Sequence, residues 1–169
     1  MDNNTAYVKA NTLLDDARAK SLRLAMAESC TGGLIAAALT EIAGASDVFD
    51  RGFVTYSNAA KCEMLGVPKE LIAAHGAVSA EAARAMALGA IDRSAADVAV
   101  AVTGIAGPGG GSPKKPVGLV YFACARRGGD VSLIERRYGS LSRAEIRAAS
   151  VLQALDMMIE AVNAVQRRP

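Results

Sequence analysis

The sequence has few aromatic residues and almost no net charge. Of its 169 residues none is Trp and 4% are aromatic, whereas 51% are hydrophobic, with Ala prominent among them. Proteins that bind single-stranded nucleic acid stack bases on aromatic side chains, so this composition argues against that class. The net charge of +2 is far from the basic excess that neutralising many phosphates requires. We therefore expect no nucleic-acid partner, and any bound anion should be small and held at a local site.

Histidine, cysteine and long apolar runs are also scarce. The chain has one His, His75, and three scattered Cys, Cys30, Cys62 and Cys124, with no CxxC motif. This pattern excludes a cysteine zinc site, disfavours most zinc enzymes and suits a reducing compartment, so we expect no metal. No apolar run approaches the roughly 18 residues that span a bilayer, and the first ten residues do not resemble a secretion signal. The sequence therefore predicts a cytoplasmic protein with no membrane partner.

Apolar periodicity predicts strands that alternate with helices along the whole chain. Helices are expected over 5–19, 34–42, 58–65, 68–74, 80–91 and 143–165, and strands over 22–27, 52–56, 98–102, 117–125 and 131–138. Strands alternating with helices indicate a parallel sheet covered on both faces, and the final pair of strands indicates a hairpin. Length favours one domain. The prediction is α/β: a single three-layer α/β/α domain over residues 1–169, with a mostly parallel, mixed sheet.

Ligands of open α/β sheets bind at the carboxyl ends of the strands, and the segment after the first predicted strand is the first candidate. It contains Ser29, Cys30, Thr31, Gly32 and Gly33. At a helix start, free N–H groups favour a phosphate, a carboxylate or an oxyanion, so Ser29 could act as a nucleophile there. Alternatively, Thr31 caps the helix and the glycines make the turn. Cys30 is either a rival nucleophile, acidified by the helix start, or a small buried residue.

A serine nucleophile needs a base, and Lys61 is the candidate because His75 is expected at a helix end. Lys61 lies one turn into the helix that begins near Asn58. Burial there would lower the pKa of its amine and leave it neutral at physiological pH, which would give a Ser-Lys hydrolase pair. The alternative is a solvated helix lysine. Tyr56, at the end of the second strand, either orients a substrate or relays a proton, or is a buried tyrosine bonded to the backbone.

The third strand end carries a glycine-rich segment over 103–116. It matches neither the Walker pattern nor GxGxxG, which disfavours a nucleotide triphosphatase. Thr103 and Gly104 could still line a small pocket, whereas residues 109–115 have the composition of a flexible surface loop. Arg143, near the start of the last helix, could hold a phosphate or carboxylate in a forked contact. Three other arginines, Arg136, Arg137 and Arg147, are equally available by charge. Simple exposure is the alternative for these three and for Arg143.

Three segments of the sequence carry a family resemblance when they are taken together. They are AESCTGG over 27–33, GFVTYSN over 52–58 followed by Lys61, and TGIAGP over 103–108 followed by KPVG over 115–118. In this order and spacing the chain closely resembles the CinA C-terminal domain family, the nicotinamide-nucleotide amidases, from its first helix to its last. The resemblance implies hydrolysis of the carboxamide of nicotinamide mononucleotide to nicotinate mononucleotide and ammonia, in pyridine nucleotide recycling.

The resemblance also implies a role for individual residues. The family's serine nucleophile and lysine base fall on Ser29 and Lys61, and its supporting tyrosine, threonine and arginine resemble Tyr56, Thr103 and Arg143. The expected substrate-binding residues are Thr31, Gly32, Gly33, Asn58, Gly104 and Arg143. The implied amidase needs no cofactor. The implied partner is a small-molecule nucleotide, and whether the chain forms a homo-oligomer stays open.

Two other functions are kept as alternatives. One is a non-catalytic nucleotide-binding module linked to competence or damage responses, and the other is a general hydrolase of small amides. Many family members carry a second, N-terminal domain that resembles molybdopterin-binding proteins. This chain is too short to contain that domain, so the resemblance implies the stand-alone amidase and no pyrophosphatase activity.

Overall fold

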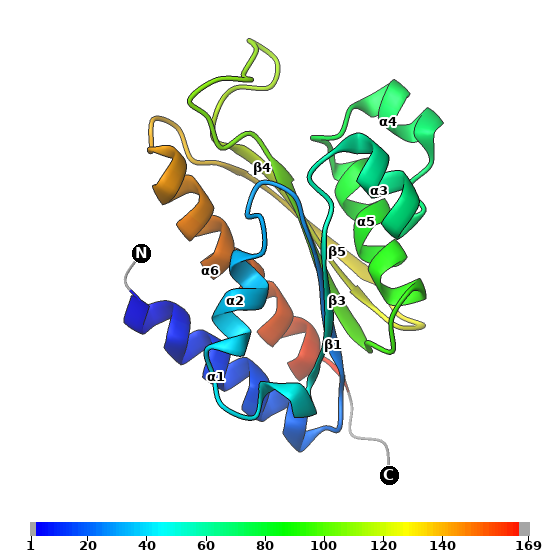
Figure 1. Ribbon diagram of the computed structural model, residues 1–169, viewed down its shortest axis with the longest axis vertical. Helices are drawn as coiled ribbons and strands as arrows, with labels where there is room; N and C mark the ends of the chain where they lie inside the picture. Colours follow the sequence, from blue (N-terminus) through cyan, green and yellow to red (C-terminus); the bar gives the residue numbers. More distant parts are fainter. Residues whose placement is uncertain (1–2, 166–169) are drawn as a thin grey trace.

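The computed structural model describes residues 3–165, which form a five-stranded sheet between two layers of helices (Figure 1). The strands are β1 (Leu24–Glu28), β2 (Phe49–Val54), β3 (Val98–Gly104), β4 (Leu119–Arg126) and β5 (Val131–Arg137). Their order across the sheet is β2-β1-β3-β4-β5. β1 is parallel to β2 and to β3, whereas β4 is antiparallel to β3 and to β5. Every strand except β4 therefore runs in one direction, which confirms the predicted mixed, mostly parallel sheet.

The helices divide between the two faces of the sheet (Figure 1). One face is covered by α1 (Asn3–Ala19), α2 (Leu34–Thr40) and α6 (Arg143–Asn163). The other is covered by α3 (Asn58–Leu65), α4 (Lys69–His75) and α5 (Ala80–Asp92). A short 3-10 helix over Ala45–Asp47 leads into β2. This arrangement confirms the predicted three-layer α/β/α fold.

The side chains of β3 explain how an Ala-rich sequence fills this core. Successive strand residues point to opposite faces, so Val98, Val100 and Val102 pack toward α1, α2 and α6, whereas Ala99 and Ala101 pack toward α5. Small side chains on that second face let the helices pack closely. Gly89 of α5 shows how closely, because a Cβ there would lie 2.1 Å from the carbonyl oxygen of Leu65 in α3.

The second strand is the one whose predicted bounds were clearly wrong. It was predicted over 52–56, but β2 begins at Phe49 and ends at Val54, so Tyr56 lies beyond the strand. β2 is an edge strand, and the residues at 51 and 52 are exposed to solvent. Because Asp50 and Arg51 are charged, the first half of this strand has no apolar pattern to reveal it.

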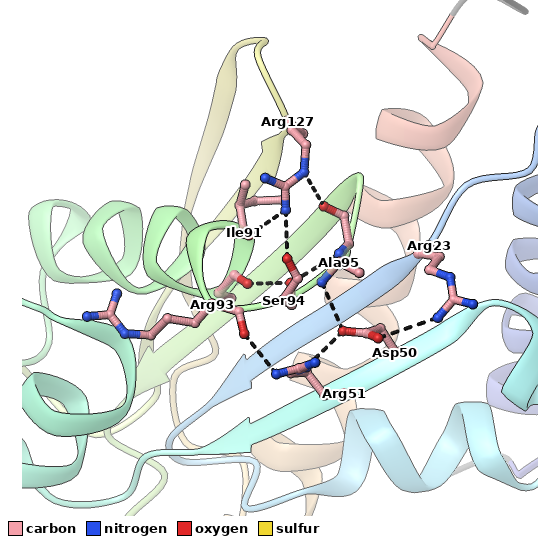
Figure 2. Close-up of polar contacts among 10 residues, drawn as sticks. Arg23, Asp50, Arg51, Ile91, Arg93, Ser94, Ala95 and Arg127 are labelled. Atoms are coloured by element: carbon pink, nitrogen blue, oxygen red, sulfur yellow. Dashed lines mark hydrogen bonds and ion pairs between the residues drawn. The ribbon is translucent and has the colours of Figure 1, made fainter.

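The end of α5 farthest from the carboxyl ends of the strands is held by two arginines (Figure 2). Arg127 donates to the carbonyl oxygens of Ile91 and Ser94 at 2.6 and 2.9 Å, and Arg51 donates to that of Arg93 at 3.0 Å. The last carbonyls of a helix have no partner within it, so these contacts satisfy acceptors that the helix leaves open. We therefore assign both arginines to the fold and not to anion binding.

No helix within residues 3–165 is long and apolar enough to cross a membrane. The predicted domain also included residues 1, 2 and 166–169, which lie outside the described residues.

Candidate active site

The carboxyl ends of β1, β2 and β3 open into a pocket of about 270 Å³. Most of the predicted site residues line it: Ser29, Tyr56, Asn58, Lys61, Thr103, Gly104 and Arg143. They come from three separate segments and the start of α6. The structure does not bring Thr31, Gly32 and Gly33 into the lining of this pocket, although all three were expected to bind substrate.

Ser29 and Lys61 form a buried pair at the bottom of this pocket. Ser29 follows β1 directly, and its N–H donates to the carbonyl oxygen of Val102 in β3 at 3.0 Å. Lys61 reaches toward it from the first turn of α3 and is 1% exposed. The Nζ atom of Lys61 lies 3.1 Å from the Oγ atom of Ser29. The alternative that Lys61 is a solvated helix lysine is therefore wrong.

The surroundings of the Lys61 amine favour its neutral form. Burial lowers the pKa of the amine, and the nearby thiols of Cys30 and Cys62 oppose this only in part. A neutral amine has two N–H donors and one lone pair. The carbonyl oxygens of Thr55 and Tyr56 lie 2.8 and 3.5 Å from Nζ and can accept both N–H groups. The lone pair is then left for the hydroxyl proton of Ser29, so the pair can perform general-base chemistry.

Cys30 does not have the properties of a nucleophile. Its side chain is buried, and burial raises the pKa of its thiol to about 11. The expected acidification at a helix start is absent, because desolvation outweighs the interactions that lower this pKa. The thiol is protonated near neutral pH, which confirms the interpretation of Cys30 as a small buried residue.

Glu28 is a buried residue whose role the sequence did not reveal. Its Oε2 atom accepts hydrogen bonds from the N–H groups of Gly33 and Ile35 at 3.0 and 3.1 Å, and its Oε1 atom accepts one from Ala36 at 2.9 Å. These are the N–H groups at the start of α2 that were expected to hold an anion. They are occupied by the protein's own carboxylate, which corrects that expectation. An acidic residue shortly before a helix start is the signal that could have indicated it.

The turn between Ser29 and α2 depends on its glycines. The N–H of Gly32 donates to the carbonyl oxygen of Ser29 at 3.0 Å. Gly32 and Gly33 have φ values of +60° and +98°, a region that favours glycine. Within residues 3–165 the buried hydroxyl of Thr31 has no hydrogen-bond partner. The glycines therefore make the turn, as the alternative interpretation held, but Thr31 does not cap the helix.

Tyr56 and Arg143 meet at the mouth of the pocket. Tyr56 is 62% exposed, and its hydroxyl oxygen accepts a hydrogen bond from Nη2 of Arg143 at 3.1 Å. Nη1 of Arg143 donates to the carbonyl oxygen of Gly107 at 2.8 Å. The alternative of a buried Tyr56 bonded to the backbone is wrong. The contacts join the end of the β2 segment, the start of α6 and the glycine-rich loop around the opening.

One wall of the pocket is a backbone segment that sequence reasoning missed. Ala77 and Val78 line the pocket. The hydroxyl of Thr103 donates to the carbonyl oxygen of Ala77 at 2.7 Å, and Nζ of Lys115 donates to that of Val78 at 2.8 Å. Thr103 thus holds the wall, and Lys115 ties the glycine-rich loop to it. Residues 109–114 are exposed, as expected of a surface loop, but Lys115 anchors the end of this loop to the pocket wall. Ala77 and Val78 carry no polar side chain that could have signalled them.

His75 lies outside this site. It ends α4, and its Nδ1 atom lies 3.5 Å from Oε1 of Glu81. Within the part of the chain that the structure describes, no three His, Cys, Asp or Glu side chains are grouped so that they could hold a metal ion.

The fold and the site define an α/β protein with a buried serine-lysine pair in a pocket at the carboxyl edge of its sheet. The chain belongs to the CinA family: the sequence model of the CinA C-terminal domain matches residues 7–162. It is 54% identical over 141 residues to a "CinA-like protein" of Geobacter sulfurreducens. The matched residues make up 83% of this chain and 34% of that protein. The chain thus spans about a third of the length of the curated relatives it matches.

Solved structures with the same fold carry related names. The competence/damage inducible protein CihA from Agrobacterium tumefaciens is 56% identical and has a TM-score of 0.92, over 94% of this chain and 96% of that chain. A competence-damaged protein (CinA) superfamily protein from Enterobacter cloacae is 32% identical with a TM-score of 0.87, over 93% of this chain and 92% of that chain. These names refer to induction by competence or damage and to the CinA superfamily, but they name no reaction.

Proposed function

We propose that the protein is an amidohydrolase that converts nicotinamide mononucleotide to nicotinate mononucleotide and ammonia. The observation that carries the reaction type is the buried contact of 3.1 Å between Nζ of Lys61 and Oγ of Ser29. A serine hydroxyl beside a desolvated amine is the arrangement of a serine-lysine hydrolase. The substrate follows from the resemblance to the family, and the pocket agrees in having both a reactive serine and a cation, Arg143, at its mouth.

The first half of the reaction forms an ester on Ser29. The neutral amine of Lys61 takes the hydroxyl proton as Oγ attacks the carboxamide carbon, and the carbonyl oxygen becomes an oxyanion. When this intermediate collapses, the C–N bond breaks, and the protonated Lys61 gives its proton to the departing nitrogen. Ammonia leaves, and the acyl group stays on Ser29.

The second half restores the enzyme with water. Lys61 is neutral again and takes a proton from the water that attacks the ester carbonyl. The C–O bond to Ser29 then breaks, the serine oxygen recovers its proton from Lys61, and the carboxylic acid product leaves. Neither half needs a metal or a cofactor for its balance of protons and electrons.

We expect the phosphate of the substrate to bind at the mouth of the pocket. Arg143 is exposed and lines the pocket, and its guanidinium already donates to Tyr56 and Gly107. A guanidinium can bind a phosphate through two parallel hydrogen bonds. We therefore assign the phosphate to Arg143, with Tyr56 and Asn58 beside it.

Incubating the purified protein with nicotinamide mononucleotide and measuring ammonia tests the proposal. We expect activity in the wild type and in Cys30→Ala, and loss of activity in Ser29→Ala and Lys61→Met. Lys69→Met, in an exposed lysine of α4, is the matched control for Lys61→Met. Full activity of Ser29→Ala would refute the nucleophile, and full activity of Lys61→Met would refute the base.

Two further outcomes separate the alternative functions. Binding of the mononucleotide without any ammonia release would favour the non-catalytic nucleotide-binding module. Equal rates on nicotinamide, its riboside and its mononucleotide would favour a general hydrolase of small amides, because only the mononucleotide offers a phosphate to Arg143.

A further inference from the structure

Arg147 contacts the backbone of the turn that follows Ser29. It lies on α6, one helical turn beyond Arg143, and is half-buried. Its Nε atom donates to the carbonyl oxygen of Cys30 at 3.1 Å, and its Nη2 atom donates to that of Thr31 at 3.0 Å. Arg147 is not among the residues that line the pocket, so its guanidinium faces the turn and not the substrate.

These contacts fix the direction of the N–H group of Thr31. A peptide group is planar and trans, so its C=O and N–H bonds point in opposite directions. Because Arg147 holds the carbonyl of Cys30, the N–H of Thr31 must point away from Arg147. The same reasoning applies one residue earlier, since the carbonyl of Ser29 accepts the N–H of Gly32 at 3.0 Å. The N–H of Cys30 therefore points away from the interior of the turn.

The N–H groups of Cys30 and Thr31 differ from the others in this turn. Neither donates to another residue within the described range 3–165, whereas the N–H of Gly32 is bound to Ser29. The N–H of Gly33 is bound to the carboxylate of Glu28. Of these two residues Cys30 lines the pocket and Thr31 does not, so one oriented donor follows the nucleophile directly, while the start of α2 itself has its N–H groups occupied.

We propose that Arg147 is a positioning residue for the chemistry at Ser29, because it holds the carbonyls of Cys30 and Thr31 and thereby fixes the turn so that the N–H of Cys30, a residue that lines the pocket, faces the developing oxyanion. The proposal rests on the serine chemistry of the proposed function but not on its substrate. Donors that are oriented before the reaction stabilise the transition state without reorganising, which is why one fixed peptide group affects the rate.

The expected effect falls on kcat. Removal of an oxyanion donor costs about 10²–10³ in kcat, and a donor that is only loosened should cost less, about 10- to 100-fold. KM should change little because Arg147 does not touch the substrate. The dependence of the rate on pH should also be unchanged, because the base is Lys61.

The test uses Arg147→Met and a matched control, Arg136→Met. Arg136 also donates to α6, from its Nε atom to Oε1 of Gln153 at 2.7 Å, but lies away from the turn. One assay is ammonia release from nicotinamide mononucleotide. A second assay needs no substrate. It measures the rate at which a fluorophosphonate labels Ser29, monitored by mass spectrometry of the intact protein. In that step the bond from Oγ to phosphorus forms, the P–F bond breaks, fluoride leaves and Lys61 takes the proton.

We expect slower labelling and lower kcat in Arg147→Met, wild-type values in Arg136→Met, and partial recovery in Arg147→Ala when millimolar guanidinium is added. Recovery without a change in Tm is a result that a purely structural role would not produce. Wild-type rates in Arg147→Met would overturn the proposal, as would a defect that guanidinium does not relieve. If Arg147→Met does not fold, the same comparison is made with Arg147→Lys, which keeps the charge but loses the fork.

The two assays separate this inference from the proposed function. Labelling of the wild type that slows in Arg147→Met, without ammonia release from the mononucleotide, would contradict the substrate and support the inference. Ammonia release with equal labelling of wild type and Arg147→Met would support the substrate and overturn the inference.

Discussion

Replacing Lys61 with Met should change how the stability of the protein depends on pH. Lys61 is 1% exposed, and burial lowers the pKa of its amine below the ordinary value of 10.5. Met keeps most of the unbranched side chain but carries no ionisable group. The substitution therefore removes the Lys61 amine as a titrating group from both the folded and the unfolded state.

The sign of the effect follows from proton binding. The unfolded chain binds a proton at Lys61 up to its ordinary pKa of 10.5, whereas the folded chain releases that proton at a lower pH. Between these two pKa values the unfolded state holds more protons, so the stability of the wild type rises with pH. The rise can reach about 1.4 kcal/mol per pH unit for one proton. The rise in stability ends above pH 10.5. Below the pKa of Lys61 in the folded state, the contribution of Lys61 to stability does not change with pH.

Urea denaturation of the wild type and Lys61→Met at several pH values measures this difference. We expect the free energy of unfolding of the wild type, relative to Lys61→Met, to increase from neutral pH toward alkaline pH. Lys69→Met, which changes an exposed lysine, should run parallel to the wild type. Parallel curves for the wild type and Lys61→Met would mean that the Lys61 amine keeps its proton in the fold, which would refute its role as a neutral base.

Three more substitutions test other parts of the structure. Glu28→Gln replaces one accepting carboxylate oxygen by an NH₂ group at the start of α2, so we expect a loss of about 1–3 kcal/mol in urea denaturation; unchanged stability would contradict the buried cap. Lys115→Met should raise KM for the amide substrate because the pocket wall loses its tie to the glycine-rich loop, whereas Lys114→Met at the exposed neighbouring position should not; equal KM values would refute the tie. Partial burial of Asp50 is outweighed by hydrogen bonds from the Ala95 N–H and a neighbouring arginine, so the pKa of its carboxyl lies below 3.8. The stability that Asp50 adds over Asp50→Asn should therefore be full above pH 3.8 and disappear as pH falls through the lowered pKa, and thermal melts that keep a constant difference at acid pH would contradict this.

The layers of the fold could be predicted because burial leaves a strong pattern in the sequence. The continuous apolar run of β3 and the Ala-rich run of α5 indicate a covered strand and a covering helix. The first half of β2 could not be predicted in the same way. Asp50 and Arg51 sit in an edge strand, where side chains are free to be charged, so their positions depend on pairing with β1 and not on burial.

The meeting of the two candidate catalytic side chains could also be predicted, because carboxyl ends of parallel strands meet at one edge of a sheet. This geometry brings Ser29 and Lys61 together although they are 32 positions apart. The residues that hold the site could not be predicted. Glu28 and Arg147 bind backbone groups, and such contacts depend on the path of the chain, which residue types do not specify. The location of the protein and its lack of membrane and nucleic-acid partners stay predictions.

The rate of ammonia release from nicotinamide mononucleotide, measured across pH in the wild type and in Lys61→Met, tests the central claim most directly. For the wild type the account predicts a rate that rises with pH and levels off once the Lys61 amine is neutral. Lys61→Met should be slower by about 10²-fold or more and should lose this rise, because the general base is gone. A wild type that releases no ammonia, or a Lys61→Met variant that follows the wild-type profile, would contradict the account.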